Sequence, residues 1–137
     1  MKIVSEAKTN SIEIIKLESV YESYPSYRIE LKIDTQKVKA THDNFTWVSL
    51  SDIETFLSQL EYLDKYRNQE AVLESMSPGE MRLIFKPLDS LGHLLVKLEI
   101  GKVDHINREY SYNVSVEFRI DPTALPYIKQ DFIALTR

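Results

Sequence analysis

The feature that most constrains the fold is a strict alternation of apolar and polar residues between Tyr110 and Asp121. One face carries Tyr110, Tyr112, Val114, Val116, Phe118 and Ile120. Polar or charged residues occupy every position between them. A period of two predicts a strand with one buried face and one face in water. Because antiparallel sheets commonly leave one face in water, this segment favours an antiparallel sheet.

Three further segments alternate in the same way. Residues 27–33 place Tyr, Ile, Leu and Ile opposite charged neighbours. Residues 81–85 and 94–100 also alternate, and the sequence Asp89-Ser90-Leu91-Gly92 between them is typical of a turn. The last two segments are therefore predicted to form a hairpin.

The segment from Ile12 to Leu17 is also strand-like, although its pattern is irregular. Its apolar residues change face between Ile14 and Ile15. This change indicates either a β-bulge or burial on both faces.

A helix is predicted from Asp52 to about Tyr66. Ser51 is a suitable N-cap, and Glu54 three residues later completes a capping box. The apolar stripe has the helical period and comprises Ile53, Phe56, Leu57, Leu60 and Leu63. The opposite face, expected to be in water, comprises Asp52, Thr55, Ser58, Gln59 and Glu61.

A second helix is predicted to start near Asp121-Pro122-Thr123. With Thr123 as N-cap, Pro126 takes the third helical position, where a missing N–H removes no helical bond. Leu125, Ile128, Phe132 and Leu135 then share one face. Alternating strands and two one-sided helices predict an α+β fold in which an antiparallel sheet has both helices packed on one face. The length of 137 residues suits a single domain over residues 1–137.

The composition excludes several classes of protein. The absence of cysteine excludes disulfides, thiolate zinc sites and a cysteine nucleophile. The N-terminus lacks the apolar run of a signal peptide, and no apolar run is long enough for a membrane span. We therefore expect a cytoplasmic protein without membrane contact. A net charge of −4 and the absence of any Lys/Arg run argue against direct nucleic-acid binding. The same charge suits solubility and a basic protein partner.

No catalytic pattern is present. The three histidines, His42, His93 and His105, lie in separate segments, outside any HxH or HExxH spacing. No GxSxG occurs, and the 3 glycines cannot form a phosphate-binding loop. His93 follows the predicted hairpin turn and is expected to help fix it. The sequence therefore predicts no enzyme, no metal and no cofactor.

The aromatic residues allow two interpretations. Tyrosine and tryptophan pack well in cores, and they are also enriched in interface hot spots. We expect Trp47 in the core. For Tyr21 and Tyr24, which lie in an irregular segment with a proline, both readings stay open.

The order and local sequences of several segments resemble those of the WapI-like immunity proteins. Bacteria make these proteins to neutralise the toxic tip of a contact-delivered toxin. The matching segments are Phe45–Ser49 leading into Phe56–Leu60, Ala71–Met76, Leu83–Phe85 turning through Leu91–His93 into Leu94–Val96, and Val116–Leu125. The resemblance covers about Phe45 to Leu135. It supplies no catalytic residue, and the recognition surface in this family differs from member to member.

The resemblance implies a protein that binds a basic toxin domain, such as a nuclease, and blocks it. From expected exposure, the candidate partner contacts are Tyr21, Tyr24, Asp52, Glu61 and Asp64. An alternative is a structural or regulatory protein-binding module without enzymatic activity, which could form a homodimer through an exposed sheet face. The sequence leaves monomer and homodimer open.

Overall fold

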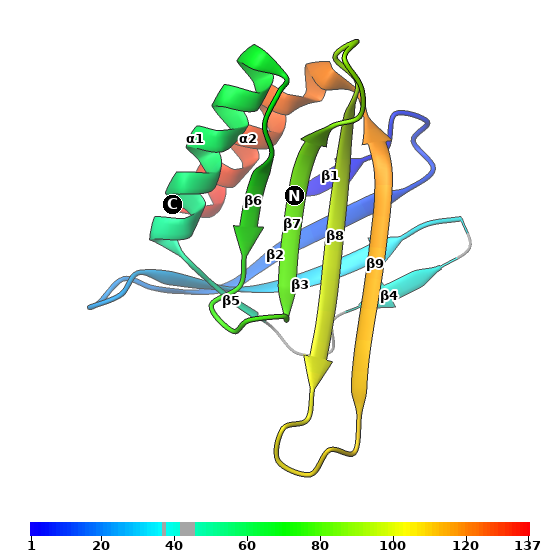
Figure 1. Ribbon diagram of the computed structural model, residues 1–137. Coiled ribbons are helices and arrows are strands. Elements are labelled where there is room, and N and C mark those ends of the chain that lie inside the picture. Colours follow the sequence, from blue (N-terminus) through cyan, green and yellow to red (C-terminus); the bar gives the residue numbers. More distant parts are fainter. Residues whose placement is uncertain (37, 42–45) are drawn as a thin grey trace.

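The computed structural model describes residues 1–36, 38–41 and 46–137. Two antiparallel sheets and two helices form the described part of the chain (Figure 1). The predicted α+β class is confirmed. The strands are divided between two sheets, whereas the sequence patterns describe one.

The elements in chain order are β1 (Lys2–Val4), β2 (Ser11–Val20), β3 (Ser26–Asp34), β4 (Lys39–Thr41), β5 (Thr46–Ser49), α1 (Leu50–Tyr66), β6 (Ala71–Glu74), β7 (Met81–Pro87), β8 (Leu94–Val103), β9 (Ser111–Ile120), the 3-10 turn η1 (Pro122–Ala124) and α2 (Leu125–Leu135).

The first sheet is built around the hairpin of β2 and β3. β1 pairs with the free side of β2, and β3 pairs with both β4 and β5. The predicted alternation in β3 is confirmed, since its apolar residues are buried and the charged ones are not. In β2, Ile14 is buried and Ile15 is half-buried on the opposite face. The register breaks only later, between Lys16 and Glu18, so Leu17 is the extra residue of the bulge.

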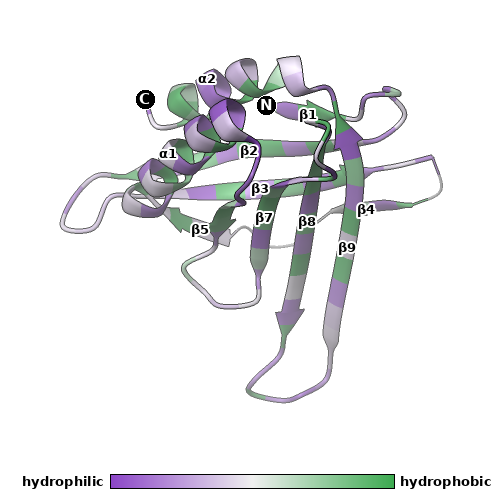
Figure 2. Cartoon of the chain, turned by 45° about the horizontal axis from the view of Figure 1, so that its top comes forward, coloured by the Kyte–Doolittle hydropathy of each residue, from purple (hydrophilic) through white to green (hydrophobic). Residues whose placement is uncertain are grey.

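The second sheet is a meander in the order β6-β7-β8-β9. Leu83 faces Leu98 across β7 and β8, and Leu98 faces Val116 across β8 and β9, so the predicted hairpin is confirmed. Figure 2 shows the alternation of hydrophobic and hydrophilic residues along β8 and β9. These two strands and their connecting loop continue past the start of β7 as a long arm (Figure 1).

The core lies between the two sheets, whose strands cross in Figure 1, and the two helices that lie side by side at one end. Each element contributes its apolar face. The largest fully buried side chains include Tyr27, Phe56, Phe85 and Phe132. Because apolar residues from all layers meet here, burial of their area is the main force that holds the sheets and helices together.

α1 begins two residues earlier than predicted. Its N-cap is Ser49, whose hydroxyl accepts a hydrogen bond of 3.0 Å from the backbone N–H of Asp52. The predicted capping box of Ser51 and Glu54 is therefore wrong. The reason is that β5 runs into α1 without a loop, so Ser49, the last residue of the strand, has the extended backbone that an N-cap needs. The predicted apolar stripe is buried apart from the half-buried Leu57.

The predicted cap of the last helix is also wrong. Asp121 caps the turn η1 that precedes α2, and its carboxylate accepts bonds from the backbone N–H of Thr123 at 3.0 Å and from its hydroxyl at 2.8 Å. The N-cap position of α2 itself is Ala124, which makes no side-chain cap bond. Thr123 lies within η1, and Pro126 is the second residue of α2. The predicted apolar face of α2 is buried. Asp121, rather than Thr123, takes the capping position because Pro122, the next residue, fixes the backbone angle φ for a tight turn that already includes Thr123.

Candidate functional site

The histidines of the described residues do not form a metal centre. No group of three or more His, Asp or Glu side chains there could hold a metal ion. His105 is exposed in the loop between β8 and β9. His42, like Phe45, lies outside the described residues.

His93 holds the hairpin turn, as predicted. Its Nδ1 lies 2.6 Å from Oδ2 of Asp89, whose other oxygen accepts a 2.8 Å bond from the N–H of Leu91. The hydrogen bond from His93, followed by those from the backbone, lowers the pKa of the Asp89 carboxyl. Gly92 has a positive φ of 90°, and its carbonyl accepts a 2.9 Å bond from Arg67. These contacts stabilise the turn between β7 and β8.

The strongest candidate for a recognition surface is what we call the hairpin–helix end. It comprises the turn Tyr21–Pro25 between β2 and β3 and the start of α1, Leu50–Glu54. The two parts are joined by a bond of 2.9 Å from the N–H of Leu50 to the carbonyl of Pro25. Figure 1 shows the hairpin projecting from the body beside the start of α1.

The tyrosines of this surface are exposed, and a buried ring holds Tyr21 in place. Tyr21 is 58% exposed and Tyr24 is 57% exposed. The ring of Tyr21 meets the fully buried ring of Tyr27 edge-on, with centroids 6.1 Å apart. The hydroxyl of Tyr27 in turn donates to the carbonyl of Thr136 at 3.1 Å. An exposed aromatic ring fixed by a buried one loses little freedom on binding, which suits an interface anchor.

The hairpin–helix end is acidic. Glu22, Asp52 and Glu54 are exposed, and neither part of the surface contains lysine or arginine. Burial raises the pKa of Tyr27, and the nearby Tyr21 and Glu54 raise it further. Glu54 at the start of α1 therefore lies near Tyr27, the buried tyrosine beneath this surface.

Three of the five predicted contacts, Tyr21, Tyr24 and Asp52, therefore lie at this end. The other two lie roughly 14–18 Å further along α1, given a rise of about 1.5 Å per residue. Glu61 pairs with Lys129 of α2 at 3.2 Å, and Asp64 pairs with Arg67 at 3.2 Å. Both carboxylates thus already have cationic partners within the chain.

The prediction that Trp47 belongs to the core is wrong. Its neighbours Thr46 and Val48 are buried, whereas Trp47 is half-buried. In the register of β3 and β5 it faces Arg28, on the side of the sheet opposite Tyr27. A four-residue strand places only every second side chain inward, and Trp47 falls on the outward parity.

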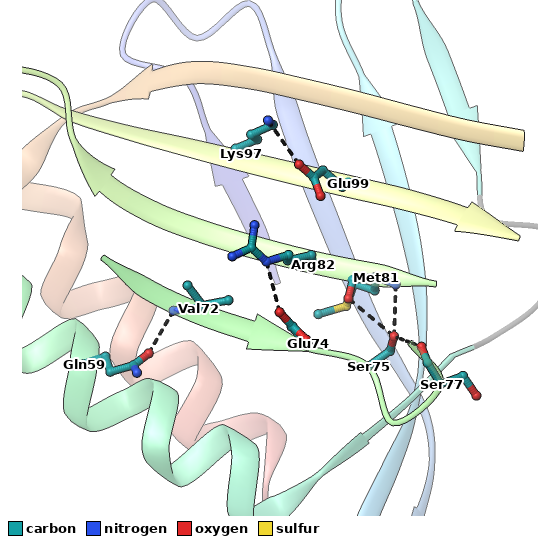
Figure 3. Close-up of polar contacts among 9 residues, drawn as sticks. All are labelled: Gln59, Val72, Glu74, Ser75, Ser77, Met81, Arg82, Lys97 and Glu99. Carbon is teal, nitrogen blue, oxygen red and sulfur yellow. Dashed lines mark hydrogen bonds and ion pairs between the residues drawn. The ribbon is translucent and has the colours of Figure 1, made fainter. Parts of the chain in front are cut away.

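The outer face of the second sheet is charged but internally paired. Arg82 contacts Glu74 at 3.0 Å, and Lys97 contacts Glu99 at 3.1 Å (Figure 3). A third pair, Lys86 and Glu117, measures 3.2 Å. Since cations and carboxylates alternate here, this face has little net field, unlike the hairpin–helix end.

Sequence reasoning missed Glu22 and Glu54 as members of the candidate surface. Glu22 lies in a turn without periodicity, and Glu54 is conspicuous in the sequence only as a capping residue. It also missed the pair Tyr62 and Tyr66 on α1, whose rings are tilted by 42° with centroids 4.6 Å apart. Their spacing of four residues was an available signal.

Comparisons with known proteins identify the family. The model of the immunity protein WapI-like family matches residues 8–135, almost the whole chain. Searches of the curated proteins and of the solved structures found no match. In the described part of the chain, neither helix has the length and apolarity needed to span a membrane. The match over residues 8–135 shows that this chain belongs to the WapI-like immunity protein family.

Proposed function

We propose that this protein is a non-catalytic immunity protein that binds and neutralises the toxic domain of a cognate contact-delivered toxin in the cytoplasm. The observation that carries the proposal is the family match over residues 8–135. The toxin contact is assigned to the hairpin–helix end, because exposed tyrosines and exposed carboxylates share this surface. A basic toxin domain is the complementary partner.

Each part of this surface has a separate physical task. Tyr21 and Tyr24 supply large apolar rings with a polar tip, the kind of group that dominates binding energy when a partner desolvates it. Glu22, Asp52 and Glu54 attract a basic partner during approach, which accelerates association more than it strengthens the final complex. Inhibition results from covering the toxin's active site, and a tight complex buries about 800 Å² on each partner.

The proposal is tested by growth of cells that produce the toxic domain encoded beside the gene for this chain. Wild-type protein is expected to restore growth. The double variant Tyr21→Ala/Tyr24→Ala is expected to restore little, because both anchors are lost. The matched control is Tyr127→Ala, since Tyr127 is 75% exposed and lies on α2.

The outcomes of this experiment test the immunity role and the assigned contact surface separately. If wild-type protein leaves the toxin equally lethal, the immunity role is refuted for this partner. If the double variant protects as well as wild type, the role stands and the hairpin–helix end is not the contact. Circular dichroism spectra of both variants verify that they are folded.

A further inference from the structure

The outer edge of β9 presents a regular row of backbone groups. In an antiparallel pair, alternate residues direct their N–H and C=O towards the neighbouring strand. The bond of 3.0 Å from the N–H of Asp104 to the carbonyl of Tyr110 shows that even-numbered residues of β9 point to β8. The carbonyl of Arg119 points the other way, because it accepts a 2.8 Å bond from Glu6. Odd-numbered residues therefore point outward.

Four residues of this row have no backbone partner in the described part of the chain. In the part of β9 that precedes Arg119, the outward-facing N–H and C=O groups belong to Ser111, Asn113, Ser115 and Glu117. They form an uninterrupted edge across most of the strand.

Three other sheet borders are covered or short. At the far border of the same sheet, β6 lies along α1, and the side chain of Gln59 accepts a 2.9 Å bond from the N–H of Val72 (Figure 3). In the first sheet, β1 and β4 have three residues each. Proteins commonly protect long edges with a helix, a lysine or a proline. β9 differs from these borders in being both long and unguarded.

The side chains of β9 also suit pairing with another strand. On the outer face, Ser111, Asn113 and Ser115 are small, exposed and uncharged. On the inner face, Val114 and Val116 are only half-buried, although they pack against the core. An added strand would complete the burial of these two valines without placing a like charge opposite a charge.

We propose that β9 pairs antiparallel with β9 of a second copy of this chain, so that the two four-stranded sheets become one. The register places Val114 opposite Val114, Asn113 opposite Ser115, and Ser111 opposite Glu117. It is the symmetric register that uses all four outward residues of each copy and leaves out Arg119, whose carbonyl is already bonded.

The symmetry of this register is the reason for choosing a second copy of the chain as the partner of β9. A two-fold axis requires a self-complementary strand, and the row of four outward residues places its small, uncharged members at the centre and its one charged member, Glu117, at the end. Glu117 then faces a serine, and it already pairs with Lys86 at 3.2 Å. Figure 1 places β9 at the opposite side of the molecule from the hairpin–helix end, so the dimer leaves that surface open. The inference does not depend on the proposed toxin binding.

The test uses single cysteines, because the chain has none of its own. Residues opposite one another in a non-hydrogen-bonded pair have Cα atoms about 4.5 Å apart, which permits a disulfide. Val114→Cys is expected to form a disulfide-linked dimer at least tenfold faster than Ser115→Cys under mild oxidation. Ser115 is the more exposed position, so random collision gives the reverse order.

Sedimentation of the wild-type protein gives the second readout. A concentration-dependent dimer is expected, weakened at least tenfold by Ser115→Pro and unchanged by Ser115→Ala. Proline removes the outward N–H, which bonds to nothing within the described chain. If Ser115→Pro does not fold, the proposal is tested by the cross-linking rates of the two cysteine variants.

Three results overturn the proposal. One is a wild-type monomer at all concentrations together with equal cross-linking of the two cysteine variants. Another is a dimer that Ser115→Pro, correctly folded, leaves intact. The third is a monomer whose Asn113 and Ser115 amides are protected from hydrogen exchange only when the toxin domain is added, which would assign the edge to the toxin.

Discussion

Truncation of Phe56 is expected to destabilise the protein strongly, because this ring joins three elements. Phe56 of α1 is fully buried, and its ring centroid lies 5.0 Å from that of Phe132 on α2 and 5.9 Å from that of Phe85 on β7. Replacing a buried phenylalanine by alanine costs about 3–5 kcal/mol of unfolding free energy. Within this sum, each aromatic pair contributes about 0.5–1.5 kcal/mol. Small domains have about 5–15 kcal/mol in total, so Phe56→Ala loses a large fraction.

Urea unfolding followed by circular dichroism measures this loss. The midpoint is expected to fall while the dependence on urea stays unchanged, because the surface exposed on unfolding is nearly the same. Thr55→Ala is the control, since Thr55 is the exposed neighbour on the same helix and should change stability by under about 0.5 kcal/mol. A loss below about 1.5 kcal/mol for Phe56→Ala would refute the view that its ring joins the helices to the second sheet.

Two other predictions concern single contacts, and a third concerns the charge of the hairpin–helix end. Gln59→Leu should cost about 1–3 kcal/mol in the same urea assay, because it leaves the N–H of Val72 without its acceptor, whereas Ser58→Ala should be nearly neutral. The Asp89 carboxyl has a lowered pKa in the folded state, so its stabilisation is present above its unfolded pKa of about 3.9 and is lost as pH falls through the folded value. The melting temperature of Asp89→Asn should therefore lie below that of wild type at neutral pH and approach it near pH 2; a constant difference would contradict this sign. Association with a basic toxin domain, followed by stopped-flow fluorescence, should slow about tenfold between roughly 50 mM and 500 mM salt, and a salt-independent rate would argue against steering.

The strands with one buried face were predictable, and their grouping into sheets was not. The alternation in residues 27–33 identifies the buried side chains of β3. In the predicted strand Tyr110–Asp121 it identifies the face that turns inward, but only Phe118 and Ile120 of that face are buried, because the other end of β9 extends beyond the core. A period of two contains no information on which strand lies alongside or which layer lies opposite. The division into two sheets therefore appears only in the structure.

The helix caps show a second limit. Ser51 and Ser49 are both plausible N-caps in the sequence, and the choice depends on where β5 ends. Likewise Asp121 and Thr123 both offer a side-chain oxygen, and Pro122 between them decides in favour of the aspartate. Tertiary pairing and backbone restriction thus select among local signals of equal quality.

For the candidate surface, exposure could be predicted but proximity could not. The predicted exposure of Tyr21, Tyr24 and Asp52 agrees with the structure, which also brings them to one end. Glu61 and Asp64 have the same sequence character and lie elsewhere, paired with cations. Periodicity gives the face of a helix, whereas the meeting of a turn and a helix start depends on the path of β3 and β5.

The most direct test of the proposed function is calorimetric titration of the purified chain with the purified toxic domain encoded beside its gene. The proposal predicts one toxin domain per chain with a Kd below about 100 nM, in the range of specific interfaces of standard size. Tyr21→Ala/Tyr24→Ala should weaken this binding by at least about thirtyfold, the equivalent of one hot spot. Absence of binding at micromolar concentrations of both folded proteins would contradict the proposal that this chain is the immunity protein of that toxin.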